Sequence, residues 1–254
     1  MNSPKHNTGS IRILVSLISP VMMMFHTGCN GPPDLYSRST SDLIQMYQSD
    51  DKYISRQAYL ILLTEGPRFA PDLVEIIRTG TPKSSEVAAN LLRRMKPRPV
   101  RLISELMELT RDKNPLIRAD AIWALDGLGT DSLILLPVFT RAAYDVTDDG
   151  RQKAVWCIYR RAREVPEGVD ILLKIAEDSK ADTTVRTLCC SYLSKRRYNS
   201  DQDDRVLVPV FSLTSSQTER VFAVLEDLSV TSRIAESELE RIRSSLKYHV
   251  EKNN

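Results

Sequence analysis

The sequence is poor in the residues on which most catalytic and metal sites depend. It contains only three histidines in 254 residues, and His249 is the only one beyond residue 28. Histidine is the usual proton carrier at neutral pH and a common zinc ligand. The sequence also lacks a Walker-type phosphate loop, a GxSxG or HExxH motif and a zinc-type cysteine spacing. We therefore expect no catalytic residues, no metal and no cofactor, and a protein that is not an enzyme.

Glycine is scarce as well, with nine residues, and no segment of any length alternates apolar and polar residues as a half-buried strand does. With 42% hydrophobic residues, the chain nevertheless has enough apolar surface for a sizeable core. The composition therefore predicts an all-α protein without a sheet.

Beyond residue 28 there is no excess of charge of either sign. Lys5 and Arg12 are the only charged residues before that point, which leaves 33 basic and 33 acidic residues in the remainder. Proteins that bind nucleic acid usually carry a basic excess that neutralises phosphates. We expect no nucleic-acid partner.

The first 28 residues have the features of an export signal. Two basic residues precede ILVSLISPVMMMF, a mostly apolar run from Ile13 to Phe25. Its 13 residues are too few to span a bilayer, because about 20 are needed. This length is typical of the apolar core of a signal peptide, which we predict over residues 1–28.

The end of this segment, HTGC, resembles the bacterial lipobox, in which a small residue precedes a cysteine that is lipidated. Gly28 and Cys29 match the motif, whereas His26 stands where leucine is usual. The resemblance implies fatty acyl chains such as palmitate on Cys29 and a protein anchored to a membrane of the bacterial cell envelope after export. Residues 29–38 would form a flexible tether. An unlipidated signal anchor and a misassigned start codon are the alternatives.

Three cysteines remain beyond Cys29, which is an odd number for an oxidising compartment. Cys157, Cys189 and Cys190 all fall on apolar faces of expected helices. A free thiol in that position acts as a small hydrophobic side chain. We expect all three to be buried, with no redox or metal role.

A repeat runs through most of the chain. Ser85, Arg118, Arg151 and Arg186 are 33, 33 and 35 residues apart. Each is followed at the same three offsets (three, six and seven residues on) by small or apolar side chains: Ala88, Leu91 and Leu92; Ala121, Ala124 and Leu125; Ala154, Cys157 and Ile158; Cys189, Tyr192 and Leu193. Weaker copies surround Arg56 and Arg220. A fixed period of this length indicates an array of similar helical units.

Each marked helix is preceded by another helix, and three of these first helices have a proline in or near them. FAPDLVEII, SLILLPVF and RVLVPVF place Pro71, Pro137 and Pro209 in or near these first helices. Proline removes a backbone hydrogen bond and bends a helix. Asp50, Asp112 and Asp145 lie six residues before Arg56, Arg118 and Arg151, and we expect such Asp–Arg pairs to form structural hydrogen bonds in the turns.

The unit resembles a HEAT repeat of the phycobilisome-lyase type, with a bent first helix, an Asp-bearing turn and a second helix that opens with a hydrophobe–Arg pair. Ile117–Arg118 and Val185–Arg186 match that opening. The resemblance implies an all-α solenoid of about six HEAT-like helix pairs over residues 39–230. A capping helix over 231–254 would cover the last pair with the stripe Leu239, Ile242, Leu246 and Val250.

In such solenoids the second helices line a concave face. Trp123 and Trp156 share one offset in consecutive units, opposite the core side of their helices. Aromatic rings beside mixed charges favour a partner-binding site, because binding hot spots are enriched in Trp, Tyr and Arg. The candidate residues are Asp120, Trp123, Lys153, Trp156, Tyr159 and Arg160. The alternative is that the tryptophans are covered laterally and serve only in packing.

These observations favour a membrane-tethered, non-enzymatic scaffold that binds a protein or peptide. One alternative is a HEAT-like enzyme, since the family resemblance extends to bilin lyases and to DNA glycosylases that use Trp, Asp and Arg on a concave surface. The other alternative is a structural envelope protein that acts by self-association.

Overall fold

The computed structural model describes residues 35–145, 147–198, 207–231 and 236–253. The chain divides into two units, Met1–Ser39 and Thr40–Asn254. Only residues 35–39 of the first unit are described, and they include the short helix η1 (Leu35–Ser37). The expected signal peptide, the lipidation site Cys29 and most of the tether therefore lie outside the described residues.

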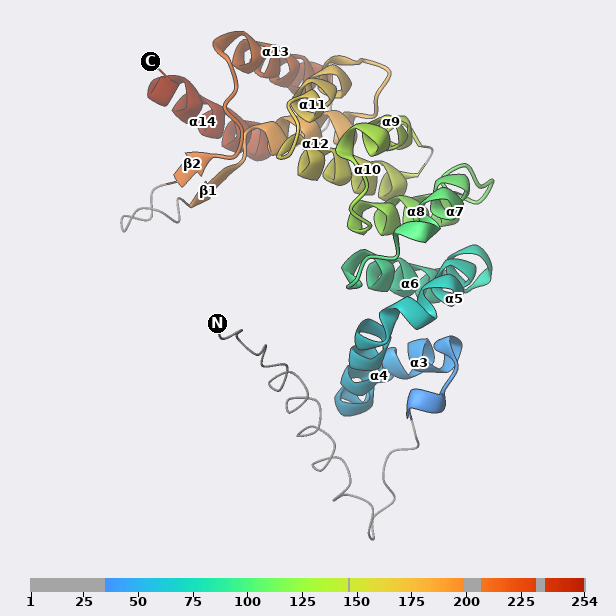
Figure 1. The fold of residues 1–254 in the computed structure, drawn as a ribbon. Coiled ribbons are helices and arrows are strands. Elements are labelled where there is room, and N and C mark those ends of the chain that lie inside the picture. Colours follow the sequence, from blue (N-terminus) through green and yellow to red (C-terminus); the bar gives the residue numbers. More distant parts are fainter. Residues whose placement is uncertain (1–34, 146, 199–206, 232–235, 254) are drawn as a thin grey trace, which may run out of the picture. The chain divides into compact units, whose positions relative to one another are not determined.

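The second unit is built from helices that pair in chain order (Figure 1). The paired helices are α3 (Thr40–Tyr47) with α4 (Lys52–Thr64), α5 (Gly66–Thr79) with α6 (Pro82–Arg94), α7 (Ile103–Leu109) with α8 (Pro115–Gly127), α9 (Ser132–Ala142) with α10 (Asp148–Ala162), α11 (Glu167–Glu177) with α12 (Thr183–Leu193), and α13 (Ser215–Thr231) with α14 (Glu236–Asn253). A short helix η2 (Val100–Leu102) precedes α7. The second helices α6, α8, α10 and α12 also contact one another in sequence. The predicted all-α helical-repeat fold is confirmed.

The start of each second helix in the first five pairs is fixed by a side-chain cap. Asp51, Thr81, Asn114, Thr147 and Asp182 each accept a hydrogen bond from a backbone N–H in the first turn of the helix that follows. Such caps satisfy donors that have no partner within the helix. The turn sequence therefore sets where each second helix begins.

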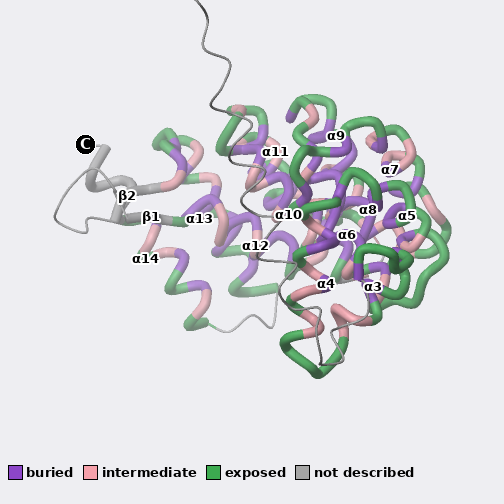
Figure 2. The backbone as a smooth tube through the Cα atoms, turned by 60° about the horizontal axis from the view of Figure 1, so that its bottom comes forward, coloured by how far each residue is buried: buried purple, intermediate pink, exposed green. Residues whose placement is uncertain are grey.

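Small side chains allow neighbouring helices to approach closely. Ala88, Ala121, Ala154 and Cys189 occupy the same position in four successive second helices, and all are fully buried. Figure 2 shows buried residues running through α6, α8 and α10, with exposed residues gathered at the turns. Cys157 and Cys190 are also buried, and no disulfide joins these three cysteines. The expectation that they fill the core is confirmed.

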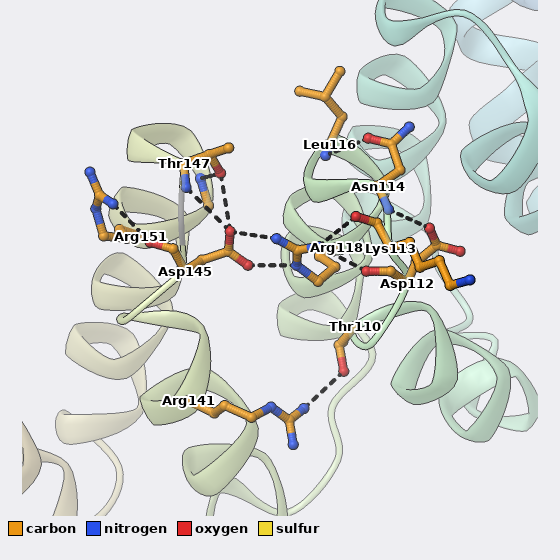
Figure 3. A network of polar contacts seen from close by, with 11 residues as sticks. Thr110, Asp112, Lys113, Asn114, Leu116, Arg118, Arg141, Asp145, Thr147 and Arg151 are labelled. Atoms are coloured by element: carbon orange, nitrogen blue, oxygen red, sulfur yellow. Dashed lines mark hydrogen bonds and ion pairs between the residues drawn. The ribbon is translucent and has the colours of Figure 1, made fainter.

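Arg118 links one helix pair to the next (Figure 3). Its Nη1 atom donates to the backbone carbonyls of Asp112 and Lys113, at 2.8 and 3.0 Å, and so closes the turn of its own pair. Its other nitrogens donate to the carboxylate of Asp145, which lies in the turn of the following pair. Arg151 in turn donates to the backbone carbonyl of Asp145, at 2.8 Å. The expected structural role of the Asp–Arg pairs is confirmed here.

The segment around Pro209 departs from the expected helix. Residues Arg196–Tyr198 form strand β1, which pairs antiparallel with β2 (Leu207–Pro209). The predictions of a first helix at this point and of no sheet are therefore wrong. Because Val208 and Val210 are β-branched, the segment is suited to an extended backbone, and the N–H of Val210 donates to the carbonyl of Lys195 at 2.8 Å.

The last pair is completed by α14 rather than by a helix before α13. Leu239, Ile242 and Leu246 are fully buried, as the predicted stripe requires, and the side chain of Val250 lies outside the described residues. Within the described part of the chain, no helix combines the length and the apolar character needed to cross a membrane.

Candidate functional site

Trp123 and Trp156 come together on neighbouring second helices. Trp123 lies on α8 and Trp156 on α10, and their ring centroids are 4.9 Å apart with an angle of 51° between the planes. Both side chains are half-buried. Each ring therefore covers part of the other and leaves part of its surface open to solvent.

Arg93, on α6, completes this contact, although the sequence analysis did not select it. Its guanidinium carbon lies 4.3 Å from the ring centroid of Trp123 and 4.7 Å from that of Trp156. The indole N–H of Trp123 donates to Oδ1 of Asn90 at 2.8 Å. Asn90 lies 33 residues before Trp123, at the equivalent position of the preceding repeat. The repeat spacing could therefore have predicted that this face of α6 belongs to the same surface.

The carboxylate of Asp126 lies beneath this contact and is inaccessible to solvent. Its Oδ2 atom accepts from Nε of Arg93 at 3.2 Å and from Nη1 of Arg160. Arg161 donates to the backbone carbonyl of Asp126 at 2.8 Å, and its Nη2 lies 3.8 Å from Oδ1. Three guanidinium groups therefore surround one buried carboxylate, which leaves an excess of positive charge.

Gly127 sets the distance between α6 and α8 at this point. A Cβ atom on Gly127 would lie only 2.1 Å from the backbone oxygen of Arg93 and 2.3 Å from its Cα atom. Only glycine permits this approach, because the obstacle is backbone that cannot rotate away. The close contact places the side chain of Arg93 over the two tryptophans.

Lys153 and Asp120 form a second ionic contact on the same pair of helices. Nζ of Lys153 lies 3.0 Å from Asp120 and 2.8 Å from Asp149. Burial lowers the pKa of Lys153, but the two carboxylates outweigh it and the pKa is raised overall. Asp120 itself is buried and accepts a hydrogen bond from Ser85. Asp120 was predicted as a contact residue, but the structure places it beneath Lys153, where it holds neighbouring side chains.

Tyr159 continues the row of aromatic rings toward the next helix. It stacks on Tyr192 of α12, with centroids 4.6 Å apart, and forms a T-shaped contact with Phe211, with centroids 5.7 Å apart. Lys195 places its ammonium 4.9 Å from the ring of Tyr159 and 4.4 Å from that of Tyr192. Tyr192 was expected among the core positions, but it is half-buried because its ring turns toward Tyr159.

We call this set the aromatic–cationic surface. It brings together five of the six predicted contact residues with three that the prediction omitted. Its members are Arg93, Trp123, Lys153, Trp156, Tyr159, Arg160, Tyr192 and Lys195. Rings and cations in this arrangement can bind a ligand by stacking, by cation–π contact and by charged hydrogen bonds.

Few other groups in the described residues offer chemistry. Among them, no cluster of three or more His, Cys, Asp and Glu side chains could hold a metal ion. Burial raises the pKa of the Cys157 thiol well above its usual value, which suppresses the nucleophilic thiolate form.

The chain matches no protein-family model and no curated protein. Among solved structures, it is similar to a designed armadillo repeat protein in complex with a (KR)4 peptide, with 13% identity, a TM-score of 0.45, and coverage of 85% of this chain and 100% of the other. It is also similar to a computationally designed armadillo repeat protein for modular peptide recognition, with 13% identity, a TM-score of 0.43, and coverage of 82% and 99%. A third similarity is to a complex of phycocyanin lyase subunits from Nostoc, with 12% identity, a TM-score of 0.30, and coverage of 87% and 97%.

Proposed function

We propose that this protein is a non-enzymatic scaffold that binds a protein or peptide partner through the aromatic–cationic surface. One observation carries the proposal. Rings and cations form a contact at each successive junction between second helices from α6 to α12: Arg93 with Trp123, Trp123 with Trp156, and Tyr159 with Tyr192. If these side chains served only to pack two neighbouring helices together, a contact between those two helices would be sufficient.

The physical properties of these side chains support binding. Trp123 and Trp156 are half-buried and held in place by each other and by Arg93, so a partner would find them already ordered. Pre-ordered side chains lose little conformational entropy on binding, and Trp, Tyr and Arg contribute most to the energy of protein interfaces. The surface therefore offers a large contact area at low entropic cost.

We further propose that Cys29 carries a lipid anchor and that the protein acts at the bacterial cell envelope. The support is the apolar run Ile13–Phe25, the Gly28–Cys29 junction and the Pro- and Ser-containing residues that follow. Several acyl chains on one cysteine would hold the protein firmly, whereas one chain binds a membrane only marginally.

A site-specific photo-cross-linker tests the binding proposal. Gln152 is exposed and lies four residues before Trp156, on the same face of α10. A benzophenone amino acid at this position in the native cell should cross-link one discrete partner. The matched control is Ile134, which is exposed on the first helix α9 and outside the surface.

The proposal is supported if the cross-link from position 152 disappears in Trp156→Ala, while the control position gives none. Equal cross-linking from both positions would contradict it. A cross-linked dimer of this chain would instead favour self-association, and turnover of a nucleobase or tetrapyrrole by the purified protein would favour an enzyme.

A further inference from the structure

The charges of the aromatic–cationic surface are arranged in two levels. The carboxylates of Asp120 and Asp126 are buried, whereas the guanidinium groups of Arg93 and Arg160 keep 17% and 36% of their side-chain surface exposed. Lys153 is 14% exposed and is also paired with Asp149, whose side chain is 57% exposed. A ligand that approaches Arg93 and Arg160 therefore meets cations first. The sequence beyond residue 28 has equal numbers of basic and acidic residues, so its net charge does not reveal that some carboxylates are buried while cations are exposed.

We propose that the partner segment is an acidic peptide whose carboxylates bind at two points on this surface, one at Arg93 and Arg160 and the other at Lys195. This inference rests on the proposed binding function and specifies its chemistry. The aromatic or apolar side chains of the peptide would contact Trp123 and Trp156, which lie next to the first point.

The first point is built from two anchored guanidinium groups. A guanidinium has five N–H donors, and Asp126 engages Nε of Arg93 and Nη1 of Arg160. Within the described residues, no second carboxylate lies within ion-pair distance of either side chain. The remaining donors are held in fixed positions by Asp126 below and by the Trp156 ring beside them. Fixed guanidinium groups with free donors favour charged hydrogen bonds to a carboxylate.

The second point is a cation that faces another cation. Lys195 lies over the rings of Tyr159 and Tyr192, and its pKa is lowered by desolvation and by the positive charge of Arg241. Arg241 is tied to Glu238 at 2.7 Å, whereas no described carboxylate lies within ion-pair distance of Lys195. A bound carboxylate would supply the missing counter-charge, because an opposite charge stabilises the ammonium form.

The spacing of the two points suits an extended chain. Arg160 lies on α10, and Lys195 lies two residues after Leu193, the last residue of α12, which is the next second helix. Adjacent packed helices lie about 8–10 Å apart, and an extended chain advances about 3.3 Å per residue. Acidic residues about three positions apart therefore match these sites. A nucleic acid fits less well, because its backbone needs a longer row of cations than this surface presents.

Fluorescence anisotropy with defined peptides tests the inference. The probe is a fluorescein-labelled ten-residue peptide with Glu at positions 2, 5 and 8 and with Gly, Ser and Tyr elsewhere. We expect the purified protein to bind it at least tenfold more tightly than the same peptide with Gln at those positions, and less tightly as salt rises. Arg160→Gln and Lys195→Gln should each weaken binding of the Glu peptide at least fivefold. Neither variant should affect the Gln peptide.

Two further variants separate binding from folding. Arg78→Gln removes an exposed arginine of α5, which pairs with Glu75 and Glu105 outside the surface, and should leave binding unchanged. Lys195→Glu should weaken the Glu peptide and create binding of the matched Lys peptide. Circular dichroism of each variant checks that the helices remain intact.

Equal affinity for the Glu and Gln peptides would overturn the inference, and so would unchanged binding in Arg160→Gln and Lys195→Gln. Stronger competition by a ten-nucleotide oligothymidine or by phosphatidylglycerol vesicles than by the unlabelled Glu peptide would also overturn it, in favour of a nucleic acid or a membrane. If the cross-link from position 152 persists while the Glu peptide fails to bind, the acidic chemistry is wrong and the binding function stands.

Discussion

Arg118 forms a two-point ion pair with Asp145, with Nε–Oδ2 and Nη2–Oδ1 distances of 2.7 and 2.8 Å (Figure 3). The pair joins α8 to the turn that precedes α10, and Asp145 keeps only 9% of its side-chain surface exposed. We expect Arg118→Lys to lower the free energy of unfolding by about 1–3 kcal/mol, because an ammonium cannot reproduce the two-point contact with a nearly buried carboxylate. Urea denaturation measures the change.

The control for this variant is Arg78→Lys. Arg78 pairs with two carboxylates, those of Glu75 and Glu105, but these side chains are exposed, and such pairs contribute about 0–1 kcal/mol. Similar losses in the two variants would show that the Arg118 contact does not stabilise the junction between the helix pairs.

The sequence was sufficient to predict the helix pairs in the middle of the chain. The spacing between Ser85, Arg118 and Arg151 identified which helices are equivalent, and equivalent helices in a repeat array contact one another. The buried positions Ala88 and Ala121 followed from the same spacing, because a small residue at one crossing implies a small residue at the next.

Other features depend on distances that the sequence does not state. The burial of Asp126 and the position of Arg93 result from the close approach at Gly127, which could equally have been an ordinary helix end. The proline of the segment Leu207–Pro209 resembled the proline of a first helix, but two β-branched valines and pairing with Arg196–Tyr198 determined the outcome. Local pattern cannot decide between these conformations when tertiary pairing is available.

Gly127 should not tolerate a methyl group. We expect Gly127→Ala to lower the free energy of unfolding by about 2 kcal/mol or more, because its Cβ would overlap the backbone of Arg93 and force α6 and α8 apart. Near-ultraviolet circular dichroism should report a change in the environment of Trp123. Gln152→Ala, at an exposed helical position, is the control and should change neither quantity. Unchanged stability in Gly127→Ala would mean that this close approach is absent in solution.

Glu164 should make stability depend on pH in the acidic range. A hydrogen bond from Ser132 and the positive charge of Arg161 outweigh desolvation and lower the pKa of Glu164. The stabilisation is therefore present above the ordinary glutamate pKa and is lost as pH falls through the lowered value. Because the side chain is 53% exposed, we expect only a few tenths of a kcal/mol. The difference in stability between wild type and Glu164→Gln should shrink below about pH 4.5, and a constant difference down to pH 3 would contradict this.

Cys29→Ala tests the proposed lipid anchor. We expect the wild-type chain, expressed in a bacterium, to incorporate radiolabelled palmitate and to sediment with membranes. The variant should lose both properties and keep its helical circular dichroism, because the helix pairs begin only at Thr40. His26→Leu, which completes the resemblance to the lipobox, is a matched variant and should label at least as strongly as wild type. An unlabelled wild-type chain, or labelling that survives in Cys29→Ala, would exclude the anchor.

Trp123→Ala and Trp156→Ala distinguish a binding surface from a packing contact. Each ring is half-buried against the other and against Arg93. We expect each substitution to lower the free energy of unfolding by about 1–2 kcal/mol, since only part of the ring is removed from water. We also expect at least a tenfold loss of partner binding, because truncation of a central aromatic residue at an interface has effects of that size.

The two quantities have to be measured on the same samples, at a temperature where every variant is folded. Trp123→Phe is the informative control, because it keeps a ring against Trp156 and removes only the N–H that donates to Asn90. If the surface binds a partner, Trp123→Phe should retain most of the binding and Trp123→Ala should lose it. If the rings serve only in packing, both alanine variants should lose several kcal/mol of stability while each folded molecule binds its partner as well as wild type.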